Sequence, residues 1–516
     1  MKPEEAFSDQ ADAHIMRKAG MSDAHAHVML TKRSIDARGK RVWVNVQADI
    51  YTQELPPQRV PVRHYPNVRE ADQVVIVGAG PAGLFAALRL IELGVKPVVI
   101  ERGKDVRDRR RDLAAINKDQ TVNPESNYCF GEGGAGTYSD GKLYTRSKKR
   151  GDLQRILDIL VAHGAREEIL YDAHPHIGTN KLPKIVEQLR ESIRQAGGEV
   201  LFNTKVTDLI IEAGELKGVV TLQGDKIRGE GVILATGHSA RDIFELLHHR
   251  EVDIEAKPFA LGVRVEHPQA LIDQIQYSCP VDRGEFLPAS AYSLVSQTNV
   301  RNVQRGVFSF CMCPGGFIVP AATAPGEVVV NGMSPSRRDS KYANSGIVVA
   351  VELEDFQQYA QYGHLAGMHF QAAVEQQAFR SGGGGQVAPA QRLIDFVEGR
   401  NSSTLPDTSY QPGLNAVMMD EVLPPAIARR LKLGFKDFGK KMRGYLTNEA
   451  QIVGVESRTS SPVRIPRDRE TLEHTRLSRL YPCGEGAGYA GGIVSAAIDG
   501  ERCAEAVVKQ YIKKSD

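Results

Sequence analysis

The spacing of hydrophobic and polar residues changes several times along the chain, and each change predicts a different element. Between residues 42 and 50, apolar side chains occupy every second position, which predicts a half-buried β-strand. Four prolines within residues 53–66 then predict an extended linker. Residues 73–101 contain a short apolar run, a glycine turn, an Ala/Leu-rich helical stretch and a second apolar run, which together predict a βαβ unit.

The same reading continues toward the C-terminus. Helical spacing of Leu and Ile covers residues 152–171 and 181–196, whereas 200–222 predicts two or three antiparallel strands. Buried strands are expected at 231–237 and at 480–483, the second followed by a helix.

One long stretch without charges separates Arg305 from Glu327. Its length would suit a membrane span, but three prolines and four glycines interrupt it. We therefore expect buried strands and turns there and no membrane partner.

The balance of positive and negative residues bears on which partners the protein could bind. Among 516 residues, 65 are Lys or Arg and 63 are Asp or Glu, which gives a net charge of +2. This balance removes the electrostatic argument for binding nucleic acid or an anionic membrane. The first 30 residues hold no apolar core of a signal peptide, so we expect a cytoplasmic protein.

Cysteine usage points the same way. The six cysteines form no CxxC pair, which fits reduced thiols and gives no reason to expect a metal site. Glycine is the residue in excess, at 49 of 516 against roughly 7% in typical proteins.

The first glycine cluster carries the clearest chemistry. Gly78, Gly80 and Gly83 follow an apolar strand and open a helix, the context in which GxGxxG binds a dinucleotide. Gly78 permits the turn, Gly80 lets the backbone approach a pyrophosphate, and Gly83 allows close helix packing. Glu101 ends the second strand, where its carboxylate can accept hydrogen bonds from ribose hydroxyls. The alternative is that these glycines only turn the chain.

Two further glycine-rich segments favour FAD over NAD. They span residues 131–143 and 483–493, and a flavin must be held along its whole length whereas NAD needs no further cradle. With the strand at 231–237, these segments resemble the motifs of two-domain FAD-dependent oxidoreductases. The expected cofactor-binding residues are Gly78, Gly80, Ala82, Gly83, Glu101, Arg102, Gly133, Gly134, Gly136, Lys142, Thr236, Gly237, Gly484, Glu485, Gly491, Gly492 and Ile493.

A narrower resemblance covers most of the chain. The chain is similar to a family of bacterial FAD-dependent dehydrogenases of uncharacterised substrate, sometimes labelled NAD(FAD)-utilising. The segments that carry it are SIDAR, GEGGAGTYSDGKL, ATGHSARDIF, EAKPFALGVRVEHPQ, FCMCPGG, NGMSPSRRDSKYANSG and GEGAGYAGGIVSAAIDG. The resemblance implies bound FAD and oxidoreductase activity. It also implies a ribitol contact at Glu485, where related families carry aspartate, and backbone N–H groups at 491–493 facing the flavin ring.

The expected fold is α/β. A small N-terminal α/β unit (residues 1–70) precedes a Rossmann-type FAD-binding domain formed by 71–238 and 459–516. A mixed α+β substrate domain (239–458) is inserted between these two segments.

The expected reaction is hydride transfer between FAD and a small organic substrate. His238 and Arg241 follow the 231–237 strand and are the candidate catalytic residues, although they also fit a turn histidine and an anion clamp. A second GxGxxG is missing, so NAD(P)H would dock only transiently as electron donor, or a protein would supply electrons. The alternatives are an FAD-dependent monooxygenase and a flavin-bearing RNA-modifying or RNA-binding protein.

Several other residues have more than one interpretation. Cys129 is read as a packed thiol or a flavin-facing one, and Cys311 with Cys313 as buried strand cysteines, a redox pair or a soft-metal site. Arg337, Arg338, Lys341 and Arg458 are candidate anion contacts. Two basic clusters are expected to be solvated faces rather than docking sites for an anionic partner: Arg107, Arg109, Arg110 and Arg111, and Arg146, Lys148, Lys149 and Arg150.

Overall fold

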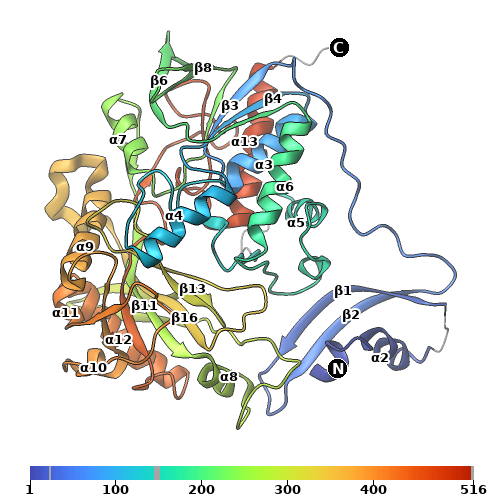
Figure 1. The fold of residues 1–516 in the computed structure, drawn as a ribbon, viewed down its shortest axis with the longest axis vertical. Helices are drawn as coiled ribbons and strands as arrows, with labels where there is room; N and C mark the ends of the chain where they lie inside the picture. Colours follow the sequence, from blue (N-terminus) through green and yellow to red (C-terminus); the bar gives the residue numbers. More distant parts are fainter. Residues whose placement is uncertain (22–24, 145–150, 513–516) are drawn as a thin grey trace.

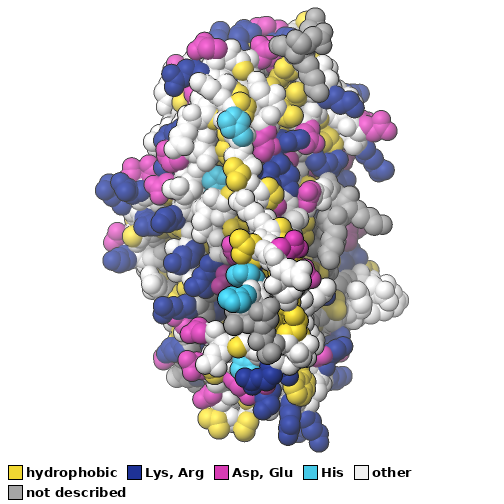
Figure 2. All heavy atoms as spheres, turned by 90° about the vertical axis from the view of Figure 1, so that its right-hand side faces the viewer, with side chains coloured by type: hydrophobic (Ala, Val, Ile, Leu, Met, Phe, Trp, Pro, Cys, Tyr) yellow, Lys and Arg dark blue, Asp and Glu magenta, His cyan; other side chains and the backbone are white. Residues whose placement is uncertain are grey.

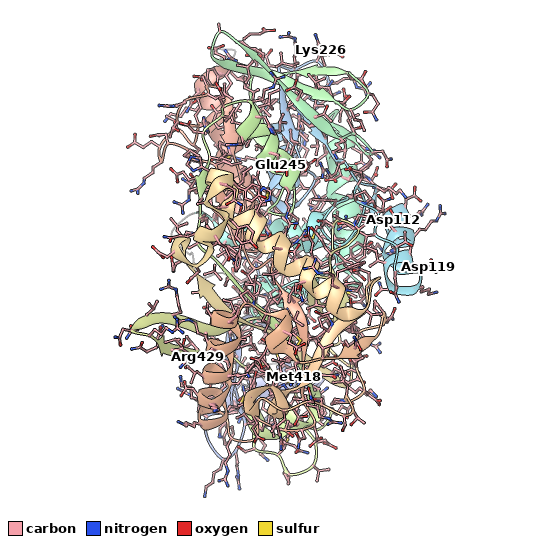
Figure 3. The ribbon with its side chains drawn as sticks, turned by 90° about the vertical axis from the view of Figure 1, so that its left-hand side faces the viewer. Asp112, Asp119, Lys226, Glu245, Met418 and Arg429 are labelled. Atoms are coloured by element: carbon pink, nitrogen blue, oxygen red, sulfur yellow. The ribbon has the colours of Figure 1, made fainter. Side chains whose placement is uncertain are left out.

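The computed structural model describes residues 1–21, 25–144 and 151–512. Two parts are stacked along the long axis of the molecule, with a hairpin of the N-terminal residues beside the lower part (Figure 1). In the side view of Figure 3, Glu245 lies in the upper part, and Met418 and Arg429 lie in the lower part.

The upper part is built on a five-stranded parallel sheet in the order β21-β9-β3-β4-β5. Its strands are short and apolar, and β3, β4, β9 and β21 are almost entirely buried, as expected for a parallel sheet covered on both faces. The strands are β3 (Gln73–Val77), β4 (Lys96–Ile100), β5 (Glu199–Leu201), β9 (Val232–Leu234) and β21 (Leu480–Pro482).

Helices cover one face of this sheet (Figure 1). They include α3 (Pro81–Glu92), α5 (Leu153–Ala162), α6 (Leu182–Gln195) and α13 (Ile493–Tyr511), and their apolar residues share one core. Helix α13 lies close against α3, because a Cβ at Gly500 would come within 2.0 Å of the Ala82 carbonyl oxygen. The predicted βαβ unit and the helices over 152–171 and 181–196 are therefore present.

The other face carries an antiparallel sheet and helix α7 (Arg241–His249). The sheet consists of β6 (Val206–Glu212), β7 (Glu215–Thr221) and β8 (Lys226–Arg228). The prediction for 200–222 was wrong at its start, since β5 joins the parallel sheet beside β4. A three-residue strand is too short for its pattern to distinguish parallel from antiparallel pairing.

The lower part is a seven-stranded sheet in the order β12-β13-β16-β11-β19-β17-β18. The strands are β11 (Phe259–Pro268), β12 (Val295–Val300), β13 (Val303–Cys313), β16 (Tyr342–Val351), β17 (Ala388–Arg392), β18 (Leu414–Ala416) and β19 (Gln451–Glu456). Helices α8 (Gln269–Tyr277), α9 (Ala366–Gly382), α10 (Leu393–Glu398), α11 (Met419–Val422) and α12 (Pro425–Lys441) belong to this part. Its apolar residues form a second core.

Shorter elements complete the lower part. Strands β14 (Phe317–Pro320) and β15 (Val330–Met333) form a hairpin, and β10 (Glu255–Ala256) pairs with β20 (Val463–Arg464). The uncharged run after Arg305 thus contains most of β13 and all of β14, as predicted.

The N-terminal residues form short helices α1 (Pro3–Ala6) and α2 (Ala11–Lys18) and a hairpin of β1 (His27–Asp36) and β2 (Trp43–Tyr51). The strand predicted for 42–50 is β2. An ion pair of 2.8 Å between Arg33 and Asp172 joins the hairpin to the upper part. No helix or strand lies between Tyr51 and Gln73, as the prolines predicted.

Helix α4 (Val106–Lys118) corrects one prediction about surface charge. Arg109 is fully buried, and its guanidinium donates to the carbonyls of Asn127 and Glu132 at 2.8 Å each. It is not part of a solvated basic face, because it turns inward and binds the 127–132 loop. The second basic cluster, at 146–150, lies outside the described residues.

The face shown in Figure 2 carries both signs of charge interspersed. Among the described residues, no helix combines the length and apolar character needed to cross a membrane.

Candidate functional site

A cavity of about 400 Å³ lies between the upper and lower parts. Most of the residues predicted to bind a cofactor line it. They are Gly78, Gly80, Ala82, Glu101, Arg102, Gly134, Gly136, Lys142, Thr236, Gly237, Gly484, Glu485, Gly491, Gly492 and Ile493. His238 lines it too, whereas Gly83, Gly133 and Arg241 do not.

The glycines of the first motif have two roles: some allow close backbone packing, and one leaves space in the cavity. A Cβ at Gly83 would lie 1.9 Å from the Gly78 carbonyl oxygen, and one at Gly78 would lie 2.4 Å from that of Ala235. A Cβ at Gly80 would meet no atom within 4 Å, because it would point into the open cavity. Gly80 is also the N-cap of α3, so the free N–H groups of that helix end are available to an anion.

Glu101 organises the loops around this turn. One carboxylate oxygen accepts from the backbone N–H of Ala79 at 3.0 Å, and the other accepts from those of Gly103 and Gly131 at 2.9 and 3.0 Å. The carboxylate thus holds the first and second glycine-rich segments together. Two oxygens offer about four acceptor positions, so one remains for a ligand hydroxyl.

Gly133 supports the second segment from behind. It adopts a φ of +77°, and its N–H donates to the Ala79 carbonyl at 2.8 Å. A Cβ there would lie 1.8 Å from the Thr137 hydroxyl. Gly133 was expected to touch the cofactor, but it does not line the cavity because it is packed against the first segment.

A carboxylate holds the late glycine-rich segment, residues 483–493, in place. The Gly484 N–H donates to Asp499 at 2.8 Å, and Asp499 is paired with Arg467 at 2.6 Å. Gly491 and Gly492 have open space where a Cβ would stand, and Gly492 caps α13. The N-terminus of α13 therefore opens onto the cavity, as that of α3 does.

Cys483, Asp499 and Cys503 have ligand atoms within 4.8 Å of one another. The Arg467 guanidinium already pairs with both Asp499 oxygens and contacts the Cys503 sulfur at 3.4 Å. The positive charge in this cluster thus comes from arginine, and its role here is to hold the Gly484 turn.

His238 connects the 231–237 strand to the late segment. Its Nε2 lies 2.9 Å from the Arg458 carbonyl oxygen and its Nδ1 lies 3.2 Å from a Glu485 carboxylate oxygen. A carbonyl only accepts, so Nε2 must carry a proton. The contact between Nδ1 and Glu485 then needs a second proton, held by one of the two groups.

Arg241 points away from the cavity. Its guanidinium donates to Glu327 and Glu375 at 2.8 Å each. Arg458 contacts the same two acids, at 3.1 and 2.9 Å. Burial and the Glu375 charge raise the pKa of Glu327 to about 7, whereas the two arginines lower that of Glu375 to about 2. Arg241 is therefore positioned as a structural cation, because its two terminal amino groups already donate to Glu327, Glu375 and Gln371.

Two of the other predicted anion contacts, Arg338 and Lys341, are also paired, whereas Arg337 is exposed. Arg338 donates to both oxygens of Asp140, at 3.1 and 2.6 Å, and Lys142 lies 3.4 Å from Asp140. Lys341 pairs with Asp407 at an exposed position, 3.7 Å away. Arg102 is bound to Asp242, and its guanidinium lies over the Phe130 ring.

Sequence reasoning missed the residues that close the cavity from the lower part. Phe310, Asn331 and Thr459 come from segments far from the glycine motifs. Cys311 lies beside them in the lining, and it was considered as a strand cysteine, a redox partner or a metal ligand but not as a residue of the cofactor cavity. Phe310 and Asn331 lie in two segments of the family resemblance, FCMCPGG and NGMSPSRRDSKYANSG, or at their edges. Their place in these family segments was the one feature of the sequence that could have pointed to them.

These features fit FAD. Four glycines, Gly80, Gly237, Gly491 and Gly492, line one cavity with open space at the Cβ position. Two helix N-termini face the same space, one suited to the pyrophosphate and one to the flavin ring.

Comparison with known proteins agrees with this chemistry. A model of an FAD-dependent protein C-terminal domain matches residues 258–459. Models of an FAD binding domain and of an FAD dependent oxidoreductase match 71–125 and 174–292, and a domain of unknown function matches 1–51. A protein of Clostridium beijerinckii, described as uncharacterized, is 42% identical over 96% of this chain and 95% of its own length.

This chain belongs to the same family of FAD-dependent proteins. The predicted cofactor, FAD, and the predicted family are thereby confirmed, and the chain is an oxidoreductase of the FAD-dependent class.

Other relatives share only part of the chain. The thiamine thiazole synthase of Aeropyrum pernix is 32% identical over 32% of this chain and 55% of its own length. The tRNA uridine 5-carboxymethylaminomethyl modification enzyme of Lactobacillus delbrueckii is 28% identical over 33% of this chain and 24% of its own. A solved flavin-dependent brominase covers 86% of this chain and 81% of its own, at 12% identity and a TM-score of 0.37, and at that score it carries no argument.

Proposed function

We propose that this FAD-dependent protein is a dehydrogenase or reductase that transfers a hydride between FAD and a small organic substrate. The observation that carries the proposal is the 3.2 Å contact between His238 Nδ1 and a Glu485 carboxylate oxygen at the wall of the cofactor cavity. Moving a hydride to or from a carbon–carbon, carbon–nitrogen or carbon–oxygen bond needs a group that gives or takes a proton beside it.

His238 is suited to that task by its surroundings. Its side chain is 13% exposed, and its Nε2–H is fixed on the Arg458 carbonyl, so the Nδ1 side is the one that exchanges a proton with Glu485. Glu485 is 30% exposed and lines the cavity, which gives the proton a route to a bound molecule.

The other residues hold FAD. Gly80 and the α3 N-terminus would receive the pyrophosphate, Glu101 the ribose, and residues 484–493 the ribitol and the flavin ring. When bound, FAD supplies the two-electron chemistry. The N-terminus of α13 stabilises negative charge that develops nearby.

The electron donor would be NAD(P)H that docks transiently, or a donor protein. The test is anaerobic reduction of the purified yellow protein by NADH, NADPH and reduced ferredoxin, followed by addition of 2-hydroxy acids, amino acids and unsaturated carbonyl compounds. Reduction or reoxidation of FAD by one member of these panels, without oxygen, supports the proposal. A protein whose FAD turns over only with oxygen and inserts an oxygen atom into its product would instead be a monooxygenase.

His238→Asn gives the residue-level test of the proton role. We expect the rate of hydride transfer to fall by roughly 10²–10⁴-fold, because a positioned general acid or base contributes about that much. FAD content should stay at the wild-type level. His174→Asn, at a histidine outside the cavity lining, is the matched control. Wild-type rates in His238→Asn would contradict the assignment.

A further inference from the structure

The end of strand β13 delivers two cysteines to the cofactor cavity. The strand pairs regularly with β16 up to Phe310, and the register then shifts before Cys313. Cys311, at the bulge, has a φ of +46°, a conformation that non-glycine residues rarely adopt and that clusters at functional sites. Cys311 lines the cavity, whereas Cys313 is fully buried behind it.

The Cys313 side chain turns back toward Cys311. Its thiol donates to the Cys311 carbonyl oxygen, which lies 3.3 Å from the Cys313 sulfur. On a regular strand two alternate side chains would only share a face.

The surroundings of this pair carry an unbalanced positive charge. The cations are Lys142, Arg264 and Arg338, and the carboxylates that pair with them are Asp140 and Glu456. Arg264 is fully buried, lies 2.8 Å from Glu456, and contacts the Cys313 sulfur at 3.8 Å and the Cys311 carbonyl at 3.4 Å.

Three cations therefore face two carboxylates among the described residues around the pair. His176, next to Asp140 and Arg338, adds no charge at neutral pH because burial lowers its pKa to about 4. The Lys142 ammonium also donates to the Met312 carbonyl, which lies between the two cysteines. A thiolate at Cys311 would balance the charge, and buried charges are normally balanced.

The pKa directions agree with that count. The interaction with Cys313 and the Lys142 charge hold the pKa of the Cys311 thiol well below its usual range. The same interaction and burial raise the pKa of the Cys313 thiol, so Cys313 is the cysteine that keeps its proton. A thiolate next to a thiol is the state from which a disulfide forms.

We propose that Cys311 and Cys313 form a redox-active dithiol that exchanges two electrons with FAD. In the forward direction a bond forms between the two sulfurs, and the Cys313 S–H bond breaks. The two electrons and the one proton that the pair loses pass to the oxidised flavin, which becomes the anionic reduced form. In the reverse direction the reduced flavin reduces the disulfide.

The site would serve as a second two-electron store beside the cofactor. It rests on FAD binding and on no particular substrate, so its failure and the failure of the hydride-transfer proposal are separable.

The first test counts electrons in the holoenzyme. Air-oxidised protein is titrated anaerobically with dithionite while flavin absorbance and free thiols are followed. Four electrons per FAD are expected for the wild type, and two for Cys311→Ser and Cys313→Ser. Cys279→Ser, which removes a thiol outside the cavity lining, should still take up four. Two electrons in the wild type, with both thiols free after air oxidation, would overturn the proposal.

The second test needs neither turnover nor a folded serine variant. The pH dependence of iodoacetamide alkylation at Cys311, read by peptide mass spectrometry in apoprotein, should show reaction at neutral pH. Lys142→Met should move the alkylation midpoint to higher pH, and Lys181→Met, whose side chain lies outside the cavity lining, should not. Alkylation of Cys311 only at alkaline pH in the wild type would mean that Lys142 faces an anionic ligand instead, and the dithiol proposal would fall.

Discussion

At the scale of single residues, the glycines of the first motif do not share one role. Gly78 and Gly83 are required by backbone that already surrounds them, since a Cβ at either would collide with a carbonyl oxygen. Gly80 is required only by what enters the cavity, because nothing in the protein fills the space beside it. Substitution separates these roles.

Gly80→Val should lose most of the bound FAD and keep its stability. Its φ of −75° and ψ of −176° suit any residue, and the added side chain would occupy the pyrophosphate position. FAD released on denaturation, per mole of protein, measures the loss, and the urea midpoint of the apoprotein measures stability.

Gly83→Val should differ in both respects, because its Cβ would lie 1.9 Å from the Gly78 carbonyl and the helix must shift. We expect roughly 1–3 kcal/mol less stability in the apoprotein. Gly39→Val, in a loop where a Cβ would meet only the Arg41 carbonyl oxygen at 3.8 Å, is the control for the substitution itself. Equal FAD content in Gly80→Val and the wild type would show that the pyrophosphate lies elsewhere.

Local sequence predicted the residues that act through their own backbone. The glycine turns, Glu101 and the strand before His238 can be predicted from local sequence, because residues nearby in the chain fix their geometry. The positions of Arg109 and Cys311 cannot be predicted in this way. The burial of Arg109 depends on carbonyls 18 and 23 residues away, and the position of Cys311 depends on a bulge that its partner strand imposes.

At the scale of elements, the contact between α3 and α13 aligns the two helix ends that face the cavity. Gly500 lies where the helices approach, with the Ala82 carbonyl 2.0 Å from a hypothetical Cβ. Ala82 lines the cavity one residue after Pro81, so a shift of α13 is transmitted to the cofactor site.

Gly500→Val should therefore weaken both stability and FAD binding. Pushing the helices apart costs roughly 1–3 kcal/mol by overpacking, and it moves residues 491–493 away from the flavin position. Thermal unfolding and the FAD dissociation constant measure the two effects. Lys509→Val, at an exposed position of the same helix, controls for helix propensity. Wild-type FAD affinity in Gly500→Val would separate the helix contact from the site.

The strand order within each sheet lay beyond sequence reasoning. Apolar runs predicted two strands within 73–101 and one at 480–483, but β21 pairs with β9, which is about 250 residues earlier in the chain. Such pairings depend on how the whole core closes. The sequence therefore predicted where the late strand lies in the chain but not the strand with which it pairs.

At the scale of the whole molecule, buried charges connect the two parts. Arg241 on α7 belongs to the upper part, Glu375 lies on α9 of the lower part, and Arg458 follows β19. Glu375 is fully buried and Arg458 nearly so. Each arginine contacts both Glu327 and Glu375, so the charges balance only when the two parts are assembled.

Arg241→Met should lower the free energy of unfolding by roughly 3–5 kcal/mol, because it leaves Glu327 and Glu375 short of one buried cation. The FAD spectrum and content should remain near those of the wild type, since Arg241 does not line the cavity. Arg250→Met, at the exposed end of the same helix, should change stability little, because an ion pair exposed to water contributes little. Unchanged stability with lost turnover in Arg241→Met would return this residue to the catalytic role.

Acid should destabilise the protein before carboxylates of ordinary pKa are protonated. His267 is 1% exposed, its Nε2–H donates to the Tyr445 carbonyl at 2.8 Å, and its Nδ1 has no partner among the described residues. Burial lowers its pKa from 6.5 to about 4, so between these pH values the unfolded chain binds a proton that the folded protein does not bind. Its neutral form therefore contributes stability that is full above pH 6.5 and is lost as the pH falls toward 4. His176 has the same direction and a pKa of about 4.

The expected loss from His267 is about 2 kcal/mol between neutral pH and pH 5, since each pKa unit corresponds to about 1.4 kcal/mol. Urea unfolding at both pH values measures it. His267→Gln keeps an N–H for Tyr445 but cannot be protonated, so it should be less stable than the wild type at neutral pH and lose about 2 kcal/mol less on acidification. His64→Gln, at an exposed position, should follow the wild type. Equal acid sensitivity in His267→Gln and the wild type would mean that other groups, and not this buried imidazole, set the lower pH limit of the fold.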